Sequence, residues 1–312
     1  MTNTALNEQA RGVFIISVTP FRESGAIDYD SADRLVEFYL DKGVTGITIL
    51  GMMGEAPKLS PEEAEQFMAY MLKRVNQRVP VIVGVSNPGL SNLTRLSSSA
   101  MDLGAAGVMV APVNGLATEE RLLGYFSEVF HSLGPDVPVC YQDYPLSTGV
   151  HVSVASFHRL VEEYPQLVML KHEDWPGLNK LSEMRRYAEH HQHRRVSILT
   201  GNGGLYLPQE LARGADGAMT GFAYPEMLSS VVKMFQQGET ENAENLYDAY
   251  LPLVRHEQQP GFGLAIRKEI LHRRGVIDTP ATRAPGPKLN SIAQKELGHL
   301  IRRMEKRVNE LG

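Results

Sequence analysis

Eight short apolar runs, separated by stretches of helical periodicity, constrain the fold of this chain more than any other feature. Most of the runs are apolar at nearly every position, which is typical of parallel strands that are buried on both faces. Strict alternation of such strands with helices predicts an α/β fold, the (β/α)8 TIM barrel. The runs are residues 12–20, 46–51, 79–85, 107–112, 137–145, 167–173, 196–203 and 217–225.

The stretches between the runs carry signals for the start and end of helices. Ser60, followed by Pro61 and Glu63, is the pattern of an N-cap with a proline in the first turn and a capping box. Ser31 is the expected N-cap of the first helix, which should stop at Gly43. An open, doubly wound sheet is the main competitor. It is disfavoured because no G-x-G-x-x-G sequence follows the first run.

The alternation of runs and helices ends after residue 237. Three helical stretches follow with no apolar run between them, and the proline-rich segment 279–289 connects two of them. The sequence therefore predicts a barrel over residues 1–237 and a helical extension over residues 238–312 that packs against the barrel.

Composition and charge exclude several classes of partner. The net charge is -5 and no block is rich in Lys and Arg, so no nucleic-acid binding is expected. No apolar run approaches the ~20 residues needed to span a bilayer, so no membrane segment is expected. The first eleven residues lack the apolar core of a signal peptide. With Cys140 as the only cysteine, an internal disulfide is impossible, and a cytoplasmic location is the simplest expectation.

The sixth run ends on a charged residue, because four apolar residues lead directly into Lys171. A lysine at a strand end can simply extend its ammonium group into water. In a (β/α)8 barrel, however, the carboxyl ends of the strands and the loops after them form the active site. A neutral lysine amine placed there can attack a ketone and form a Schiff base. Lys171 is therefore a candidate catalytic residue, with Met52, Met53, Leu170 and Met219 expected to line its apolar surroundings.

The stretch GMMGE, residues 51–55, follows the second run. Two glycines that bracket two residues make a tight loop whose backbone N–H groups can converge on an anion. The carboxylate of a 2-oxo acid is such an anion. An ordinary turn between strand and helix is the alternative, because the motif by itself is weakly specific.

Three motifs occur in barrel order: GMMGE after the second run, YQDYPLSTG at the fifth, and a lysine that ends the sixth. This combination resembles the dihydrodipicolinate synthase / N-acetylneuraminate lyase family, and the resemblance covers nearly the whole chain. Members of that family are (β/α)8 barrels, usually homotetramers, whose strand-six lysine forms a Schiff base with pyruvate or a related 2-oxo acid. The resemblance implies that Lys171 forms the Schiff base and that the backbone of Met52 and Met53 holds the substrate carboxylate. It also implies that Gly201 lies close to the bound substrate, and no cofactor is expected.

Several positions depart from the synthase for which the family is named. Met52 and Met53 replace two threonines, and a thioether cannot relay protons as a hydroxyl does. Ser147 stands where the synthase has an arginine that binds the carboxylate of its aldehyde substrate, and Asn114 replaces a tyrosine. A role as the lysine-biosynthesis synthase itself is therefore not expected.

The family's usual general acid/base, a tyrosine on strand five, also lacks a direct counterpart. Counting from Pro138, its position is occupied by Gln142. Tyr141 would face the opposite way in a regular strand, but a bulge could turn it inward. We expect Tyr141 to act as the acid/base, and Gln142 and Tyr144 to bind substrate. Tyr144, a water bound to Gln142, or a carboxylate of the substrate could act as the acid/base instead.

Three functions compete for this chain. The leading one is a lyase, of aldolase or hydro-lyase type, that acts on pyruvate or another 2-oxo acid through Lys171. The alternative is a catalytically impaired barrel that only binds a small 2-oxo acid, which the altered pocket positions motivate. A metal-dependent aldolase is the third. It is disfavoured because His172, Glu173 and Asp174 are adjacent and cannot all face one ion, so no metal site is expected.

Overall fold

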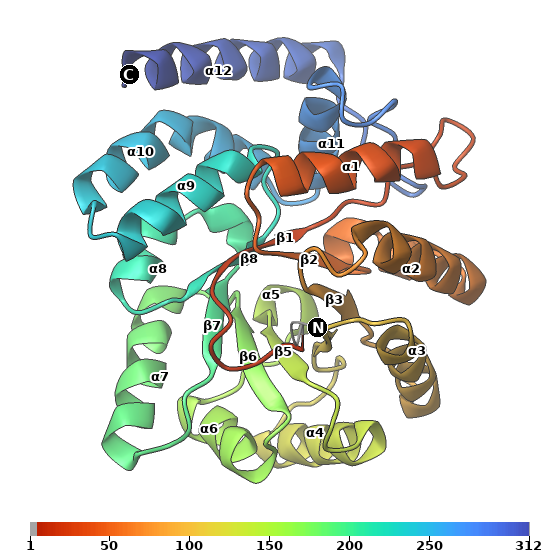
Figure 1. Ribbon diagram of the computed structural model, residues 1–312, viewed down its shortest axis with the longest axis vertical. Helices are drawn as coiled ribbons and strands as arrows, with labels where there is room; N and C mark the ends of the chain where they lie inside the picture. The colour runs from red at the N-terminus through yellow and green to blue at the C-terminus, as the bar shows by residue number, and fades with distance from the viewer. Residues whose placement is uncertain (1–4, 312) are drawn as a thin grey trace.

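The computed structural model describes residues 5–311 as eight parallel strands that close into a barrel surrounded by helices (Figure 1). Each strand pairs with the next along the chain, and β1 pairs with β8 to close the barrel. The predicted (β/α)8 TIM barrel is confirmed. The strands are β1 Gly12–Ile16, β2 Gly46–Ile49, β3 Val81–Gly84, β4 Gly107–Val110, β5 Val139–Asp143, β6 Leu167–His172, β7 Ser197–Thr200 and β8 Gly217–Thr220.

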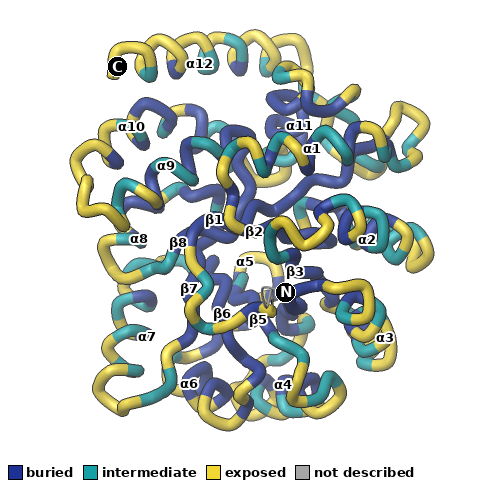
Figure 2. Tube along the Cα trace, in the orientation of Figure 1, coloured by how far each residue is buried: buried dark blue, intermediate teal, exposed yellow. Residues whose placement is uncertain are grey.

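Helices follow every strand, and they include short 3-10 turns directly after β2 and β7. Those turns are η1 Met52–Gly54, η2 Ala56–Lys58 and η3 Asn202–Gly204. The helices around the barrel are α1 Tyr29–Asp41, α2 Pro61–Val75, α3 Leu90–Asp102, α4 Glu119–Leu133, α5 Pro145–Thr148, α6 Val154–Glu163, α7 Gly177–His191, α8 Leu207–Ala212 and α9 Pro225–Gln236. The barrel strands are therefore covered on their outer face, and they appear as the buried centre of Figure 2.

Two helix starts test the capping predictions. Ser60 caps α2 with the predicted reciprocal capping box, in which the Glu63 side chain accepts from the Ser60 N–H at 2.9 Å. The prediction for Ser31 is wrong, because Asp28, three residues earlier, is the N-cap and α1 begins at Tyr29. The Asp28 carboxylate accepts hydrogen bonds from both the N–H and the hydroxyl of Ser31, and so replaces Ser31 as the cap.

Alternation along the strands decides which side chains enter the barrel. A small cluster of buried side chains that includes Phe14, Met169, Leu199 and Met219 fills the lumen, whereas a larger one packs the strands against the helices. β6 carries a bulge near its start. Val139 and Cys140 are adjacent in β5, but their partners in β6, Leu167 and Met169, are separated by one residue. Beyond the bulge, β6 keeps regular alternation up to its carboxyl end.

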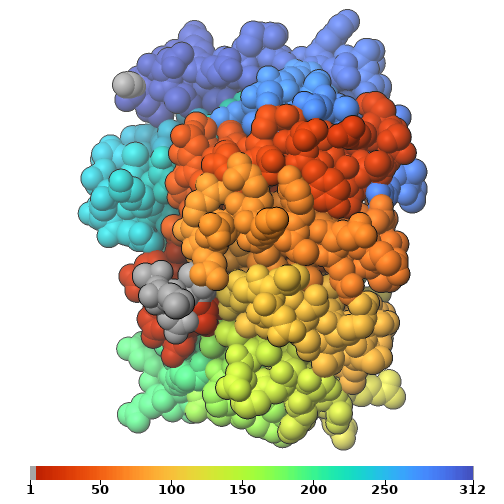
Figure 3. Space-filling view, turned by 45° about the vertical axis from the view of Figure 1, so that its right-hand side comes forward, coloured from red at the N-terminus to blue at the C-terminus, as the bar shows by residue number. Residues whose placement is uncertain are grey.

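The helices after the barrel are α10 Thr240–Glu257, α11 Gly263–Arg273 and α12 Ser291–Glu310. In Figure 3 the blue surface of the segment around α11 adjoins the red surface of α1, and Arg34 of α1 donates a hydrogen bond to the Val276 carbonyl at 3.2 Å. α12 packs against α10. The division of the chain at residue 238 stays a prediction. Within residues 5–311, no helix is long and apolar enough to cross a membrane.

Candidate active site

Lys171 lies at the carboxyl end of β6, with only 6% of its side chain exposed. Its Nζ atom is 3.1 Å from Oε2 of Glu173, two residues further along the chain. The same carboxylate oxygen accepts a hydrogen bond of 2.8 Å from Nε2 of Gln142, which pairs with Lys171 across β5 and β6. An amine, a carboxylate and an amide therefore converge at the mouth of the barrel.

The position of Glu173 follows from its neighbours on three strands. Its N–H donates to the Asp143 carbonyl at 2.9 Å, so the backbone pairing with β5 continues past the end of β6. Because side chains alternate along a strand, Glu173 shares the inner face of β6 with Lys171. A Cβ atom on Gly201 would lie 2.3 Å from Cγ of Glu173, so only glycine leaves room for this side chain. Gly201, predicted to lie near the substrate, lies directly against Glu173.

Glu173 is a candidate functional residue to which the sequence assigned no role in catalysis. Its two-residue spacing from Lys171 predicts that both side chains share one face of the strand, where the Glu173 carboxylate lies near the amine. From the sequence, it counted only as a charge near the lysine and as an unlikely metal ligand. In the structure, the Glu173 carboxylate is close enough to exchange protons with groups bound at the lysine amine.

Tyr141 is not brought to this site. Its ring lies 4.5 Å from that of Phe126 on α4 and 5.8 Å from that of Phe157 on α6, between the barrel and its helices. Burial raises the pKa of Tyr141 well above its usual range. The expectation that a bulge turns this side chain inward is wrong, because the bulge lies near the start of β6 and leaves β5 alternating regularly to Gln142.

Tyr144, just after β5, is the tyrosine that faces the site. It is half-buried, and both burial and the negative charge of Glu173 raise the pKa of its hydroxyl. Its phenol therefore lies within the electrostatic reach of the Glu173 carboxylate and can stay protonated at neutral pH.

The GMMGE loop forms the short turn η1 after β2. The N–H of Gly54 donates to Gly51 and that of Glu55 to Met52, whereas the N–H groups of Met52 and Met53 have no protein acceptor in residues 5–311. The Met53 side chain packs against the lumen cluster, to which Met219 also belongs.

Met52 and Gln142 both line the opening beside the lysine. Met52 is 39% exposed, and its Sδ accepts a hydrogen bond of 3.3 Å from the Ser147 hydroxyl. A cavity of about 450 Å³ extends between the loops after β2 and β3 and reaches Met52 and Gln142.

The whole chain can now be compared with known proteins. It matches the Dihydrodipicolinate synthetase family over residues 9–304. The chain belongs to this family. It is 30% identical over 299 residues to the L-2-keto-3-deoxyarabonate dehydratase of Azospirillum brasilense, covering 95% of this chain and 94% of that protein. It is 27% identical over 248 residues to the 4-hydroxy-tetrahydrodipicolinate synthase of Methanococcus maripaludis, covering 78% and 82% of the two chains.

Solved structures of the family agree with the fold. The crystal structure of dihydrodipicolinate synthase from Rhodopseudomonas palustris superposes with a TM-score of 0.94 and 46% identity, covering 96% of this chain and 99% of that one. The protein is thus a lyase of the dihydrodipicolinate synthetase family's type, within a family that includes aldolases and dehydratases.

The side chains on the outer face of the same strand ends have different partners from Lys171 and Glu173 on the inner face. His172 points away from the lumen, with Nε2 2.9 Å from the Gly177 carbonyl and Nδ1 3.6 Å from Asp143. Lys180 of α7 donates to Asp143 at 2.7 Å and to Asp174 at 2.9 Å. Because His172 and Glu173 lie on opposite faces of β6, they do not share a ligand. Among the described residues, no group of three or more His, Cys, Asp or Glu side chains is arranged to hold a metal ion.

Proposed function

We propose that this family member is a Schiff-base lyase, of hydro-lyase type, that acts on a 2-oxo acid through Lys171 with Glu173 as the proton carrier. The observation that carries the proposal is the 3.1 Å approach of the Glu173 carboxylate to Nζ of a buried lysine at the mouth of the barrel. Gln142 supports the proposal because its amide holds the same carboxylate oxygen in place.

The chemistry follows from the two charges. The Lys171 ammonium group gives one proton to water, and the neutral amine attacks C2 of the substrate. That proton returns when the C2 oxygen leaves as water, and an iminium group that withdraws electrons remains. The Glu173 carboxylate then takes a proton from C3, and the electrons of that C–H bond form an enamine. The enamine electrons expel the C4 hydroxyl group as water, using the proton that Glu173 holds. Hydrolysis of the remaining imine releases the product and restores Lys171.

Aldol cleavage uses the same groups in a different order. There, Glu173 takes the proton of the C4 hydroxyl group, and the C3–C4 bond breaks instead of the C4–O bond. We prefer dehydration because the A. brasilense dehydratase is 30% identical to this chain over 95% of its length.

The charges around the mouth favour a substrate with one carboxylate and an uncharged, hydroxylated tail. Lys58 is paired with Glu55, and Lys180 is paired with Asp143 and Asp174. Ser147 occupies the position of the synthase's arginine, so a second carboxylate would meet no free cation there. A 3-deoxy-2-oxo sugar acid has this form. We propose that the free N–H groups of Met52 and Met53 hold its carboxylate and that Gly201 and Tyr144 lie beside it.

Borohydride reduction in the presence of pyruvate or a 3-deoxy-2-oxo acid tests the Schiff base. Mass spectrometry of the digested protein should find one adduct, on Lys171. An adduct at another lysine, or none, would overturn the proposal. Assays over a panel of 3-deoxy-2-oxo acids separate the lyase from the alternative, a catalytically impaired barrel, because the impaired barrel would be trapped but would release no product.

Two further expectations belong to this proposal. We propose that the protein works as a homotetramer in the cytoplasm, because the family is typically oligomeric. Size-exclusion chromatography with light scattering checks the oligomer directly, and a monomer at micromolar concentration would contradict it.

A further inference from the structure

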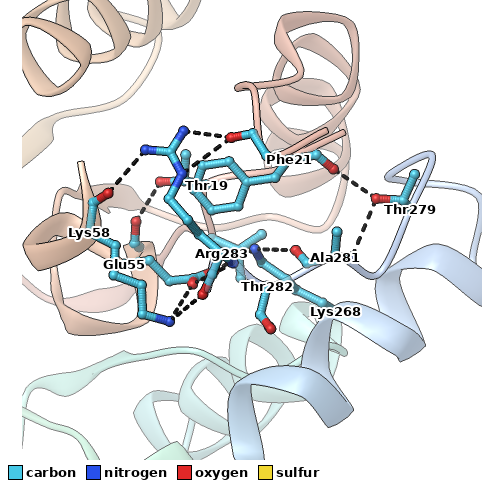
Figure 4. Close-up of polar contacts among 12 residues, drawn as sticks. Thr19, Phe21, Glu55, Lys58, Lys268, Thr279, Ala281, Thr282 and Arg283 are labelled. Carbon is cyan, nitrogen blue, oxygen red and sulfur yellow. Dashed lines mark hydrogen bonds and ion pairs between the residues drawn. The ribbon is translucent and has the colours of Figure 1, made fainter. Parts of the chain in front are cut away.

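The C-terminal extension reaches the GMMGE loop through the buried ammonium group of Lys268 and the backbone of Arg283 (Figure 4). Lys268 of α11 is fully buried, and its Nζ donates to Oε1 of Glu55 at 2.6 Å and to the Ala281 carbonyl at 2.8 Å. Arg283, which follows α11 in the connecting segment, donates its backbone N–H to Oε2 of Glu55 at 3.0 Å. Both oxygens of one loop carboxylate are therefore held from the extension.

Glu55 needs such support because of its backbone conformation. Its φ of 55° lies in the left-handed region, which residues with a Cβ rarely adopt. Glu55 ends η1, the turn that presents the N–H groups of Met52 and Met53. Its side chain is buried and also accepts from Lys58 at 2.8 Å. Removing one cation would leave part of a buried carboxylate unpaired, which favours a shift of the loop.

Phe21 extends the same support to the loop after β1. The Nζ of Lys268 and the guanidinium of Arg283 each lie 4.5 Å from the centroid of its ring. Thr19, from the same loop, donates to the Gly54 carbonyl at 2.6 Å. The loops after β1 and β2 and the C-terminal segment are thus joined around one carboxylate.

We infer that Lys268 is a positioning residue for the substrate's carboxylate, acting through Glu55 to hold the backbone of the GMMGE loop. The inference rests on the proposed function, because it assumes that this backbone binds a 2-oxo acid. It assigns to the C-terminal extension a role in substrate affinity rather than in the chemical step.

The charge of Lys268 gives this role a pH dependence. Burial lowers the pKa of Lys268 to about 8. The charge and hydrogen bond of Glu55 oppose this decrease, and the positive charges of Lys58 and Arg283 add a little to it. As pH rises through that value, Lys268 loses its proton and Glu55 loses a cationic partner. Substrate affinity should then fall, and the fall should be absent when residue 268 cannot titrate.

The test is the amount of borohydride-trapped protein as a function of pyruvate concentration, measured at several pH values for wild type, Lys268→Met and Lys58→Met. For Lys268→Met, we expect the half-saturating pyruvate concentration to rise by about tenfold to a hundredfold, the range for a displaced positioning contact. The trapped fraction at saturation should be unchanged. Arg273→Met is the matched control, because Arg273 is a cation of the same helix that pairs with Glu269 instead.

A double-mutant cycle separates positioning from general destabilisation. If Lys268 acts through Glu55, adding Lys268→Met to Glu55→Gln should raise the half-saturating concentration much less than it does in wild type. If the two substitutions raise the half-saturating concentration by independent factors that multiply in the double variant, the inference is overturned. If Lys268→Met does not fold, two other measurements decide: pyruvate affinity of the wild type above pH 8, and pyruvate affinity of Lys58→Met, which changes a partly exposed partner of Glu55. If affinity is weakened in neither, the inference is overturned. If the wild type forms the adduct and Lys268→Met binds pyruvate with unchanged affinity, this inference alone is overturned. If the wild type forms no adduct, the proposed function is overturned as well.

Discussion

The two faces of the β5 and β6 strand ends carry similar residue types with different consequences. On the inner face, Lys171 and Glu173 form an ion pair that lines the mouth of the barrel. On the outer face, His172 and Asp143 are closed in by α7, where Lys180 also pairs with Asp143. One step along the strand therefore moves a charged group from the mouth of the barrel to a site that α7 encloses.

The comparison also separates the two candidate residues of β5. Gln142 faces Glu173 and the lumen, whereas Tyr141 packs with Phe126 and Phe157. The groups on the inner face are of the kind that can exchange protons. Those on the outer face pack against helices or form buried ion pairs. Substitutions on the two faces should accordingly change different measured quantities.

The largest expected effect belongs to Lys171→Ala on the inner face. Without the amine, no imine forms, so the borohydride adduct should vanish and kcat should fall by roughly 10⁴-fold or more, as for other covalent catalysts. Mass spectrometry and a product assay measure the two effects. His172→Asn is the outer-face control and should still form the adduct; loss of the adduct in His172→Asn would break the comparison.

Glu173→Gln should lower kcat by about a hundredfold to a thousandfold, the usual contribution of a general acid/base. The adduct on the lysine should persist, because imine formation does not require this carboxylate. Deuterium exchange at C3 of pyruvate, followed by NMR, should slow in parallel with kcat. Asp174→Asn is the control, since Asp174 pairs with Lys180 on the other side of the strand. Equal losses in both variants would contradict a special role for Glu173.

His172→Asn should change stability and its pH dependence rather than chemistry. Burial by itself lowers the pKa of His172, but the polar contact with the Asp143 carboxylate 3.6 Å away, its negative charge and the hydrogen bond to the Gly177 carbonyl outweigh burial and raise the pKa. A folded-state pKa above the unfolded value means that protonation stabilises the fold below about pH 6.5 and that this stabilisation is lost as pH rises through the folded-state pKa.

Denaturant unfolding at a series of pH values measures this effect. The wild-type free energy of unfolding should fall as pH rises through that window, and the fall should be absent from His172→Asn. At low pH the substitution should cost about 1–3 kcal/mol, the cost of unpairing a buried polar group. The control is His190→Asn, which changes an exposed histidine and should leave the pH dependence of stability as in the wild type. If His172→Asn also keeps the wild-type pH dependence, the contact with Asp143 contributes nothing to stability.

The smallest effect should come from Tyr141→Phe, which removes a hydroxyl group on the outer face. We expect kcat to change by less than about twofold, as for substitutions away from the reacting groups. Tyr144→Phe removes a hydroxyl group that lies within the electrostatic reach of Glu173, and it should reduce kcat by about tenfold or more. Steady-state kinetics of the two variants decide between them, and the reverse order would restore Tyr141 as the acid/base.

Much of the fold was predictable because its signals are local. Runs of apolar residues, the capping box at Ser60 and the ordered motifs predict the barrel, and the barrel places Lys171 at its mouth. The error at Ser31 is local as well, since a second capping residue, Asp28, lies close before it in the sequence. The role of Tyr141 could not be predicted reliably, because it depends on where a bulge falls in the neighbouring strand.

By itself, the sequence determined the order of strands and helices and the strand end on which a lysine stands, because side-chain periodicity and capping depend on neighbouring residues. Only the tertiary structure decided what that lysine meets. The Glu173 carboxylate reaches it because Gly201, directly after β7, leaves space, and Glu55 meets Lys268 across 213 residues of chain. Such contacts depend on how separate segments pack, which no local pattern encodes.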